Sequence, residues 1–167
     1  VLLVDIGGGK GHDVATFAAH YSPCSGRIVL QDREPVIAGV RADGMARAFE
    51  VQAHDFFTPQ PIKGARAYSL HSILHDWSDE DGIKILKNLV PALKKDYSRV
   101  LFNEIVINEE KPTLAATNMD MMMLAHFAVR ERTEADWRDI LAQAGLKVVN
   151  IYTYPGVAES VIEAGLA

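Results

Sequence analysis

The sequence is poor in cysteine, and its basic residues are not in excess. Cys24 is its single cysteine, which excludes an intrachain disulfide and a cysteine-rich zinc site and is typical of a reducing compartment. We therefore predict a cytoplasmic location. Lysine and arginine total 17 against 22 acidic residues, so there is no excess positive charge to attract a nucleic-acid backbone. We expect no nucleic-acid partner.

The sequence also lacks a long hydrophobic run. Its apolar stretches are much shorter than the roughly 20 residues that a membrane-spanning helix requires, and no basic segment followed by an apolar one opens the chain, so we expect no membrane partner. The composition, with 49% hydrophobic and 23% charged residues, is typical of a soluble domain with one core. Val1 already belongs to an apolar run, so we expect a domain cut from a longer protein.

Short runs rich in β-branched residues alternate with amphipathic segments. The expected strands cover residues 1–6, 27–30, 49–53, 65–70, 99–107, 147–152 and 157–162, and the expected helices cover residues 11–21, 35–47, 79–95, 113–127 and 133–144. Strands separated by helices pair in parallel, whereas the last two flank Pro155 and Gly156 and predict a hairpin. The sequence thus predicts one α/β domain over residues 1–167, with a doubly wound, mostly parallel seven-stranded sheet and an antiparallel edge hairpin.

A glycine-rich turn follows the first expected strand. Gly7, Gly9 and Gly11 alternate with other residues, at the point where a doubly wound sheet binds nucleotide-like ligands. Glycine lets the backbone turn sharply and lets a ligand lie directly against it. A dinucleotide fingerprint that began at Gly7 would need glycine in place of His12, which disfavours a nicotinamide-dependent dehydrogenase. The alternative is that the glycines form only a tight structural turn.

Two acidic residues are expected at the same edge of the sheet. Asp32 ends the second expected strand, where an acid accepts hydrogen bonds from ribose hydroxyls. Asp55 follows the third expected strand and is, on its own, equally well an ordinary loop acid. The turn and Asp32 together predict a site for a ligand that contains ribose.

A series of motifs follows in order along the whole chain. They are DIGGGKG at 5–11, QDREPVI at 31–37, HDF at 54–56, ILHDWSDED at 73–81, NEIVI at 103–107, MDMMML at 119–124, ERTEADW at 131–137 and PGVAESVI at 155–162. Together they resemble the S-adenosylmethionine-dependent O-methyltransferases of the plant caffeic-acid/flavonoid and fungal secondary-metabolite type. The resemblance implies a Rossmann-like class I methyltransferase fold, S-adenosylmethionine as cofactor, S-adenosylhomocysteine as product, and no metal.

The resemblance also implies which residues bind the cofactor. The set is Asp5, Gly7, Gly9, Asp32, Arg33, Asp55, Phe56 and His71. Gly7 and Gly9 would line the methionine and ribose part, Asp32 would accept from the ribose hydroxyls, and Asp55 with Phe56 would hold the adenine. His71 stands where plant members often have lysine, which leaves its role open.

His75 follows the fourth expected strand, so it lies at the carboxyl edge of the sheet. Methyl transfer to oxygen needs an aligned acceptor hydroxyl whose proton is removed, and histidine, with a pKa of about 6.5, can take that proton near neutral pH. The resemblance assigns His75 as general base, flanked by Glu104 and Glu131 and supported by Asp76. The alternative is a histidine satisfied by backbone contacts. His71 and His75 do not share an expected helix, so we predict no metal site.

Methionines run along the expected helix over residues 113–127. Flexible thioethers suit an irregular aromatic ligand, although a helix core explains the run equally well. The resemblance places this helix beside the acceptor pocket, with Met119, Met122, Met123 and His126 as candidate contacts.

These observations predict methyl transfer to a hydroxyl, most simply a phenolic one, of a small aromatic secondary metabolite. One alternative is a methyltransferase-like pericyclase, or another non-transferring enzyme that keeps the cofactor as a structural element. Another is a catalytically dead cofactor-binding domain. The resemblance further implies a homodimer formed through an N-terminal domain that the sequence does not contain.

Overall fold

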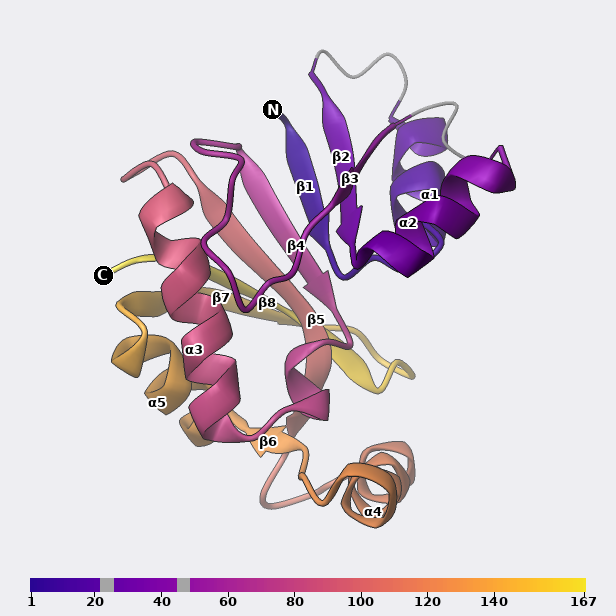
Figure 1. Ribbon diagram of the computed structural model, residues 1–167. Helices are drawn as coiled ribbons and strands as arrows, with labels where there is room; N and C mark the ends of the chain where they lie inside the picture. The colour runs from indigo at the N-terminus through magenta and orange to yellow at the C-terminus, as the bar shows by residue number, and fades with distance from the viewer. Residues whose placement is uncertain (22–25, 45–48) are drawn as a thin grey trace.

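The sheet has the predicted mixed topology. Figure 1 shows a computed structural model of the chain, described over residues 1–21, 26–44 and 49–167. The strand order is β3-β2-β1-β4-β5-β8-β7. These strands are β1 (Leu3–Ile6), β2 (Ile28–Asp32), β3 (Glu50–Ala53), β4 (Ala67–His71), β5 (Arg99–Ile107), β7 (Leu146–Thr153) and β8 (Glu159–Leu166). The first five pair in parallel, while β8 is antiparallel to both β5 and β7. The doubly wound sheet and its edge hairpin are therefore confirmed.

Five α-helices and two short 3₁₀ turns connect the described strands. They are α1 (His12–His20), α2 (Glu34–Ala42), η1 (Leu74–Asp76), α3 (Asp79–Leu89), η2 (Val90–Ala92), α4 (Leu114–Phe127) and α5 (Glu134–Gln143). Figure 1 shows α1 and α2 beside β1–β3, α3 and α5 together beside the middle of the sheet, and α4 standing apart at one end. Cys24 and residues 45–47 lie outside the described residues, and the helix expected over 35–47 ends earlier, at Ala42.

Two details of the expected elements are wrong. The α-helix expected over residues 79–95 ends at Leu89 and continues only as the η2 turn, because Pro91 has no amide hydrogen to continue the helical hydrogen bonds. The two-residue strand β6 (Arg132–Thr133), which the pattern did not predict, pairs with the end of β5. Strand β6 fixes the segment just before α5 against the sheet.

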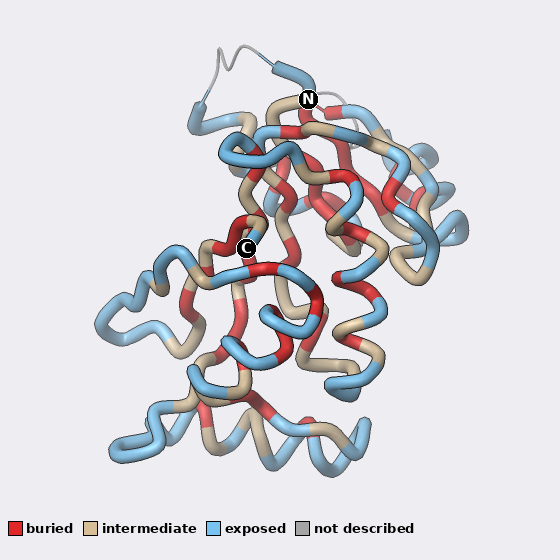
Figure 2. The backbone as a smooth tube through the Cα atoms, turned by 90° about the vertical axis from the view of Figure 1, so that its left-hand side faces the viewer, coloured by how far each residue is buried: buried red, intermediate tan, exposed pale blue. Residues whose placement is uncertain are grey.

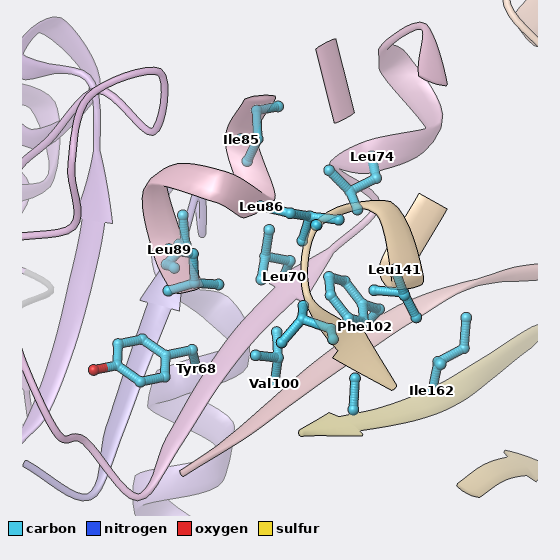
Figure 3. Packing of buried hydrophobic residues seen from close by; sticks show 14 of the residues in the cluster. Tyr68, Leu70, Leu74, Ile85, Leu86, Leu89, Val100, Phe102, Leu141 and Ile162 are labelled. Atoms are coloured by element: carbon cyan, nitrogen blue, oxygen red, sulfur yellow. The ribbon is translucent and has the colours of Figure 1, made fainter. Parts of the chain in front are cut away.

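The larger core lies between the sheet and helices α3 and α5. Figure 3 shows Tyr68 and Leu70 of β4 beside Val100 and Phe102 of β5, with leucines of α3 packed over them. Side chains alternate across a strand, so the residues between them, such as Ser69, face the other side of the sheet and are only half-buried. Figure 2 shows that burial concentrates along the strands and the inner helix faces. Burial of each large apolar side chain contributes about 1.5–3 kcal/mol.

Parallel pairing brings the carboxyl ends of β1, β2, β4 and β5 to one edge of the sheet. Ile6 is opposite Gln31, and His71 is opposite Asn103. The glycine-rich turn, Asp32 and the η1 turn all follow these ends and therefore meet. Among the described residues, none of the helices combines the length and the apolar character that crossing a bilayer requires.

Candidate active site

The glycine-rich turn has a backbone that only glycine adopts readily. Gly7 and Gly11 have φ angles of 73° and 80°, in the left-handed region that disfavours side chains. A Cβ at Gly7 would lie 2.6 Å from Cδ1 of Ile73, and one at Gly11 would lie 2.7 Å from Cζ of Phe49. The amide of Gly7 donates to the carbonyl of Gln31 at 2.8 Å. The turn therefore places bare backbone against the end of β2.

Asp32 ends β2 and faces this turn. Its Oδ2 accepts a hydrogen bond from the amide of Gly9 at 2.9 Å, and its Oδ1 accepts one from the amide of Arg33 at 2.7 Å. Each carboxylate oxygen can accept a further hydrogen bond. Asp32 is thus fixed in orientation and retains capacity for a ligand.

A cavity of about 440 Å³ opens beside Asp32. Its lining residues come from the ends of several strands and are Gly7, Asp32, Arg33, His54, Asp55, Phe56, Phe57, Ile73, Asp76 and Trp77. The volume suits one small organic ligand. Gly7, Asp32, Arg33, Asp55 and Phe56 were predicted to bind a cofactor, and the structure brings all five together here.

One wall of this cavity is aromatic. The rings of Phe57 and Trp77 meet edge to face with centroids 4.8 Å apart, and Phe56 and Trp77 do so at 5.9 Å. The carboxylate of Asp55 accepts a hydrogen bond from the amide of Phe57 at 2.9 Å and so fixes the loop that carries the phenylalanines. Sequence reasoning missed Phe57 and Trp77 as cavity residues, although both follow directly on motif residues that it selected, Phe56 and Asp76.

Asp5 and His71 line a second cavity, of about 280 Å³, and not the first. Nδ1 of His71 lies 2.6 Å from Oδ2 of Asp13, and its Nε2 lies 3.4 Å from Oε2 of Glu159. Burial lowers the pKa of His71, but these carboxylates outweigh it and raise the pKa overall.

Asp5 is a buried carboxyl group beneath the glycine-rich turn. Its Oδ2 has no hydrogen-bond partner among the described residues. Burial and the negative charge of Asp13 raise the pKa of Asp5 to about 7. Gly9 lines neither cavity, although its amide bonds Asp32 at the edge of the first, so only Asp5 and His71 of the predicted cofactor residues face the second cavity.

His75 lies in the η1 turn between two residues that line the first cavity, Ile73 and Asp76. Its Nδ1 lies 3.0 Å from Oε1 of the buried Glu131, and its Nε2 lies 3.6 Å from Oδ1 of Asp76. The side chain is 14% exposed. In the tautomer whose Nδ1–H donates to Oε1 of Glu131, the Nε2 lone pair of neutral histidine is free to take a proton.

Glu104 holds the beginning of the same turn. Its Oε1 accepts hydrogen bonds from the amides of Ile73 at 2.9 Å and Leu74 at 2.8 Å. Glu104 was predicted to flank His75, but the structure gives it hydrogen bonds to the backbone and none to the ring. Burial raises the pKa of Glu104 to about 7, against the opposing effect of His75.

The carboxylates around His75 raise the basicity of its ring. Burial lowers the pKa of His75, but the hydrogen bond to Glu131 and the charges of the neighbouring acids outweigh it, so the pKa lies above its ordinary value. Within the described residues, Oε2 of Glu104 and Oε2 of Glu131 are buried without hydrogen-bond partners. Buried polar atoms without partners are few in native proteins and call for an explanation, so these two mark the surroundings of His75 as a candidate site.

The predicted acceptor contacts on α4 are not gathered into one cavity. Met123 is buried, Met119 is half-buried, and Met122 and His126 are exposed. Nδ1 of His126 bonds the carbonyl of Met122 at 2.8 Å within the helix. Leu124, which sequence reasoning did not select, lines a third cavity of about 280 Å³ together with Trp77 and Asp79. A helix-core role thus accounts for Met123.

In the described part of the chain, no group of three or more histidine, cysteine or acidic residues is arranged to hold a metal ion.

Comparison with known sequences shows clear similarity to one group of enzymes. Residues 1–147 match the O-methyltransferase domain. O-methyltransferase mpaG of Penicillium roqueforti is 68% identical over 167 residues, which is 100% of this chain and 42% of that protein. Demethylsterigmatocystin 6-O-methyltransferase stcP of Emericella nidulans is 38% identical over 161 residues, covering 96% of this chain and 77% of that protein. The chain thus spans well under half the length of mpaG.

Solved structures give the same similarity. OxaC in complex with S-adenosylhomocysteine (SAH) and oxaline has a TM-score of 0.92 at 35% identity, over 99% of this chain and 42% of OxaC. LepI in complex with S-adenosylmethionine (SAM) has a TM-score of 0.94 at 34% identity, over 100% of this chain and 43% of LepI. LepI is also described as a pericyclic reaction enzyme. Both likenesses extend over the sheet and all the described helices.

Proposed function

The chain belongs to the O-methyltransferase domain family, and we propose from this premise that it transfers a methyl group from S-adenosylmethionine to a hydroxyl of a small aromatic secondary metabolite. The observation that carries the proposal is the contact of Nδ1 of His75 with the buried Glu131 at 3.0 Å. This contact orients the ring so that Nε2 can take a proton, which supports a reaction that removes one.

The first cavity fits the proposed cofactor. Asp32 would accept hydrogen bonds from the ribose hydroxyls, and the rings of Phe56 and Trp77 would contact the adenine. Gly7 leaves room that a side chain would fill. S-adenosylmethionine would supply the methyl group from its sulfonium and leave as a neutral thioether, so the leaving group requires no activation by a metal. Arg33, Asp55, Asp5, Gly9 and His71 complete the set that we propose for this ligand, with His71 toward the second cavity.

His75 is the proposed general base. Its Nε2 would take the acceptor hydroxyl proton, while Glu131 would stabilise the resulting imidazolium through Nδ1. General-base catalysis of this kind contributes about 10²- to 10⁴-fold in rate. Glu104 keeps the turn in place, and Asp76 lies near Nε2. A phenolic acceptor suits this base. A phenol has a pKa near 10, like the side chain of tyrosine, so a histidine whose pKa is raised can remove its proton as the methyl group is transferred.

The surface of α4 supports a role for further chain in the whole protein. Leu114 and Phe127 of α4 are 77% and 57% exposed, and the chain covers only 42% of mpaG. We propose that in the whole protein a further domain packs on α4, completes the acceptor pocket around Met119, Met122, Met123 and His126, and joins a homodimer. We propose a cytoplasmic location for that protein.

The proposal is tested by calorimetric titration of S-adenosylhomocysteine into the longest polypeptide that contains this sequence, beside its Asp32→Ala and His75→Ala variants. Asp139→Ala and His20→Ala are matched controls, because both residues are exposed and lie outside the site. We expect Asp32→Ala to abolish tight binding and His75→Ala to leave it within about threefold, since His75 does not line the first cavity.

Turnover is then measured with a panel of hydroxylated aromatic compounds by following S-adenosylhomocysteine formation. His75→Ala should lower kcat by about 10²- to 10⁴-fold for any acceptor that is methylated. Failure of the folded protein to bind S-adenosylhomocysteine would overturn the methyltransferase proposal.

The likeness to LepI favours one second candidate function, a pericyclase that keeps the cofactor without consuming it. The two functions differ in stoichiometry. Methyl transfer forms one S-adenosylhomocysteine for each acceptor consumed, whereas a pericyclase isomerises its substrate with no change in S-adenosylmethionine. The pair of His75 and Glu131 supports the first.

A further inference from the structure

Arg132 is a buried arginine that proton removal does not directly use. It lies in β6, opposite Val106 of β5, and its side chain is 2% exposed. Burial of a guanidinium is unfavourable unless its donors are paired. The hydrogen-bond partners of Arg132 therefore indicate its role in the structure.

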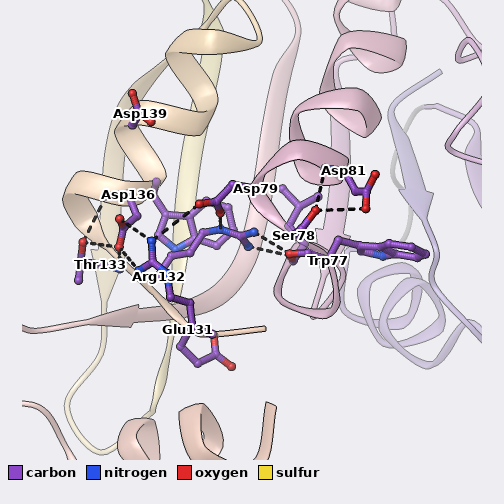
Figure 4. A network of polar contacts seen from close by, with 12 residues as sticks. Trp77, Ser78, Asp79, Asp81, Glu131, Arg132, Thr133, Asp136 and Asp139 are labelled. Carbon is purple, nitrogen blue, oxygen red and sulfur yellow. Dashed lines mark hydrogen bonds and ion pairs between the residues drawn. The ribbon is translucent and has the colours of Figure 1, made fainter. Parts of the chain in front are cut away.

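The guanidinium forms three hydrogen bonds with one short stretch of chain (Figure 4). Nη1 donates to the carbonyl of Leu74 at 2.7 Å, Nη2 donates to the carbonyl of Trp77 at 2.8 Å, and Nε donates to Oδ1 of Asp79 at 2.8 Å. The group also lies over the ring of Trp137, 5.4 Å from its centroid. These contacts fix both the position and the plane of the guanidinium.

Leu74 and Trp77 enclose the residue proposed as the base. Between them the chain makes a single 3₁₀ turn, closed by the amide of Trp77 donating to the carbonyl of Leu74 at 3.2 Å. Such turns have poor hydrogen-bond geometry and are weak on their own. Arg132 bridges the two carbonyls, so it fixes the distance across the turn that carries His75.

The amide groups at the start of the turn are bound by Glu104. Glu104 accepts from the amides of Ile73 and Leu74, while Arg132 donates to carbonyls. The carboxylate of Glu104 on β5 and the guanidinium of Arg132 on β6 thus hold the same turn from two sides. Strands β5 and β6 are themselves paired. The turn is anchored to the rigid part of the sheet by its backbone, independently of its side chains.

Arg132 also follows Glu131 directly in the chain. The amide of Glu131 donates to Oδ1 of Asp120 at 2.8 Å, and Thr133 caps α5 with Asp136 in a capping box. The same fixed segment therefore presents one carboxylate to the ring of His75 and one guanidinium to the backbone around it. Any shift of the turn against this segment would change the contact between His75 and Glu131.

We propose that Arg132 is a positioning residue for methyl transfer, which sets His75 against Glu131 and Trp77 in the cavity wall by bridging the carbonyls of Leu74 and Trp77. The inference rests on the proposed function. Arginine is required because its planar group offers donors in a fixed fork, whereas lysine presents one compact ammonium that cannot span both carbonyls and Asp79.

The test compares Arg132→Lys with two other variants. Asp79→Asn removes the ion pair but leaves both carbonyl contacts, and Arg99→Lys alters a partly buried arginine that pairs with Glu163 away from the site. We expect Arg132→Lys to lower kcat by about 100-fold, the effect of a misplacement of about 1 Å. We expect Asp79→Asn to lower kcat much less than Arg132→Lys does, because an amide oxygen can still accept from Nε of Arg132. We expect Arg99→Lys to leave kcat unchanged, because Arg99 makes no contact with the bridge. S-adenosylhomocysteine affinity should change less than kcat in Arg132→Lys.

A second readout does not depend on activity. The ring of His75 is titrated by nuclear magnetic resonance in each variant. The groups that face it are Glu131, Glu104 and Asp76, with Asp120 and Arg132 behind them. Loosening the contact with Glu131 should bring the raised pKa of His75 back toward its ordinary value in Arg132→Lys, and it should stay raised in Asp79→Asn. Should Arg132→Lys not fold, Arg132→Gln, which introduces no buried charge, is measured in its place.

The outcomes separate the two proposals. If kcat and the His75 titration in the Arg132 variant match those of Arg99→Lys, the positioning role is wrong. If the unaltered protein methylates no acceptor while the titration still shifts as expected, the proposed function fails and the placement of His75 by Arg132 stands.

Discussion

The η1 turn and helix α4 are neighbouring parts of the candidate active site, but the chain holds them in different ways. The turn is tied by Glu104, Glu131 and Arg132, each of them buried. Helix α4 buries only Ala116 and Met123. The proposed proton-transfer apparatus is therefore complete within this chain, whereas the helix proposed to contact the acceptor is left largely uncovered. The turn that carries His75 is therefore held by buried contacts within this chain, whereas α4 has few such contacts.

This difference has a physical reason. A general base must keep its geometry within a fraction of an ångström, so buried and charge-assisted contacts around it are worth their desolvation. A surface that recognises varied small molecules needs only shape and apolar character, which exposed methionine and leucine side chains provide. If α4 contacts the acceptor, as we propose, substitutions on α4 would alter acceptor choice without disturbing His75.

The largest expected effect is on the rigid side of the comparison, at Glu131. Glu131→Gln keeps the size of the side chain but removes the carboxylate that we propose stabilises the His75 imidazolium, so kcat should fall about 1,000-fold. The pKa of His75 should also fall, because part of its rise comes from Glu131. Since the neutral ring is the proposed base, the acid limb of the kcat/KM profile should move to lower pH. Glu134→Gln, at an exposed residue paired with Arg138, is the control and should match the unaltered protein.

The next effect concerns Glu104 and the stability of the turn. Its pKa is raised from 4.5 to about 7, so the fold favours its protonated form. The stability that this gives is fully present below the unfolded pKa and is lost as pH rises through about 7. By linkage the loss is at most about 3 kcal/mol.

We therefore expect the free energy of unfolding, measured in urea, to fall between pH 5 and about pH 8. Glu104→Gln should flatten this dependence in part, because Asp5 has a pKa raised to about 7 and titrates in the same range. Glu110→Gln, at an exposed loop position, should leave it unaltered. An unaltered pH dependence in Glu104→Gln would mean that burial does not control this carboxyl group.

A smaller effect is expected where α4 meets the core. Met123→Ala removes a buried side chain and leaves a cavity, so the free energy of unfolding should fall by about 2 kcal/mol. Equilibrium unfolding in urea measures the change. A loss as small as that of an exposed position would show that α4 is not packed as described.

Much of the fold was open to prediction because its signals are local. Strand and helix periods and the turn at Pro155 and Gly156 lie within short windows of sequence. Strand β6 was missed because two residues carry no period, and its place depends on pairing with β5. Pro91 was visible in the sequence and ends α3 early. The helix was extended too far because the apolar residues beyond Leu89 keep the helical spacing, although Pro91 lacks the amide hydrogen that a helix needs there.

The site divides in the same manner. Gly7, Asp32 and Asp55 were found because the ends of parallel strands meet at one edge. The contacts of Glu104 with backbone amides and of Arg132 with backbone carbonyls join segments that are distant in sequence, and no spacing rule shows them. His71 was grouped with the other cofactor residues, but it lines the second cavity with Ser69 because alternate residues of a strand share a face.

The smallest effect on stability is expected at Met122, the neighbour of Met123 on α4. It gives the most direct test of whether the η1 turn and α4 serve different purposes. Met122 is 46% exposed, so Met122→Ala should change the free energy of unfolding by no more than about 0.5 kcal/mol. If α4 contacts the acceptor, KM for the best acceptor should nevertheless rise several-fold, with S-adenosylhomocysteine affinity unchanged. Met123→Ala should show the converse, a large loss of stability with less change in KM. Equal effects of the two variants on stability and on KM would mean that the buried and the exposed side of α4 play the same part. That result would contradict the proposed division between a fixed catalytic turn and a helix that contacts the acceptor with its exposed side.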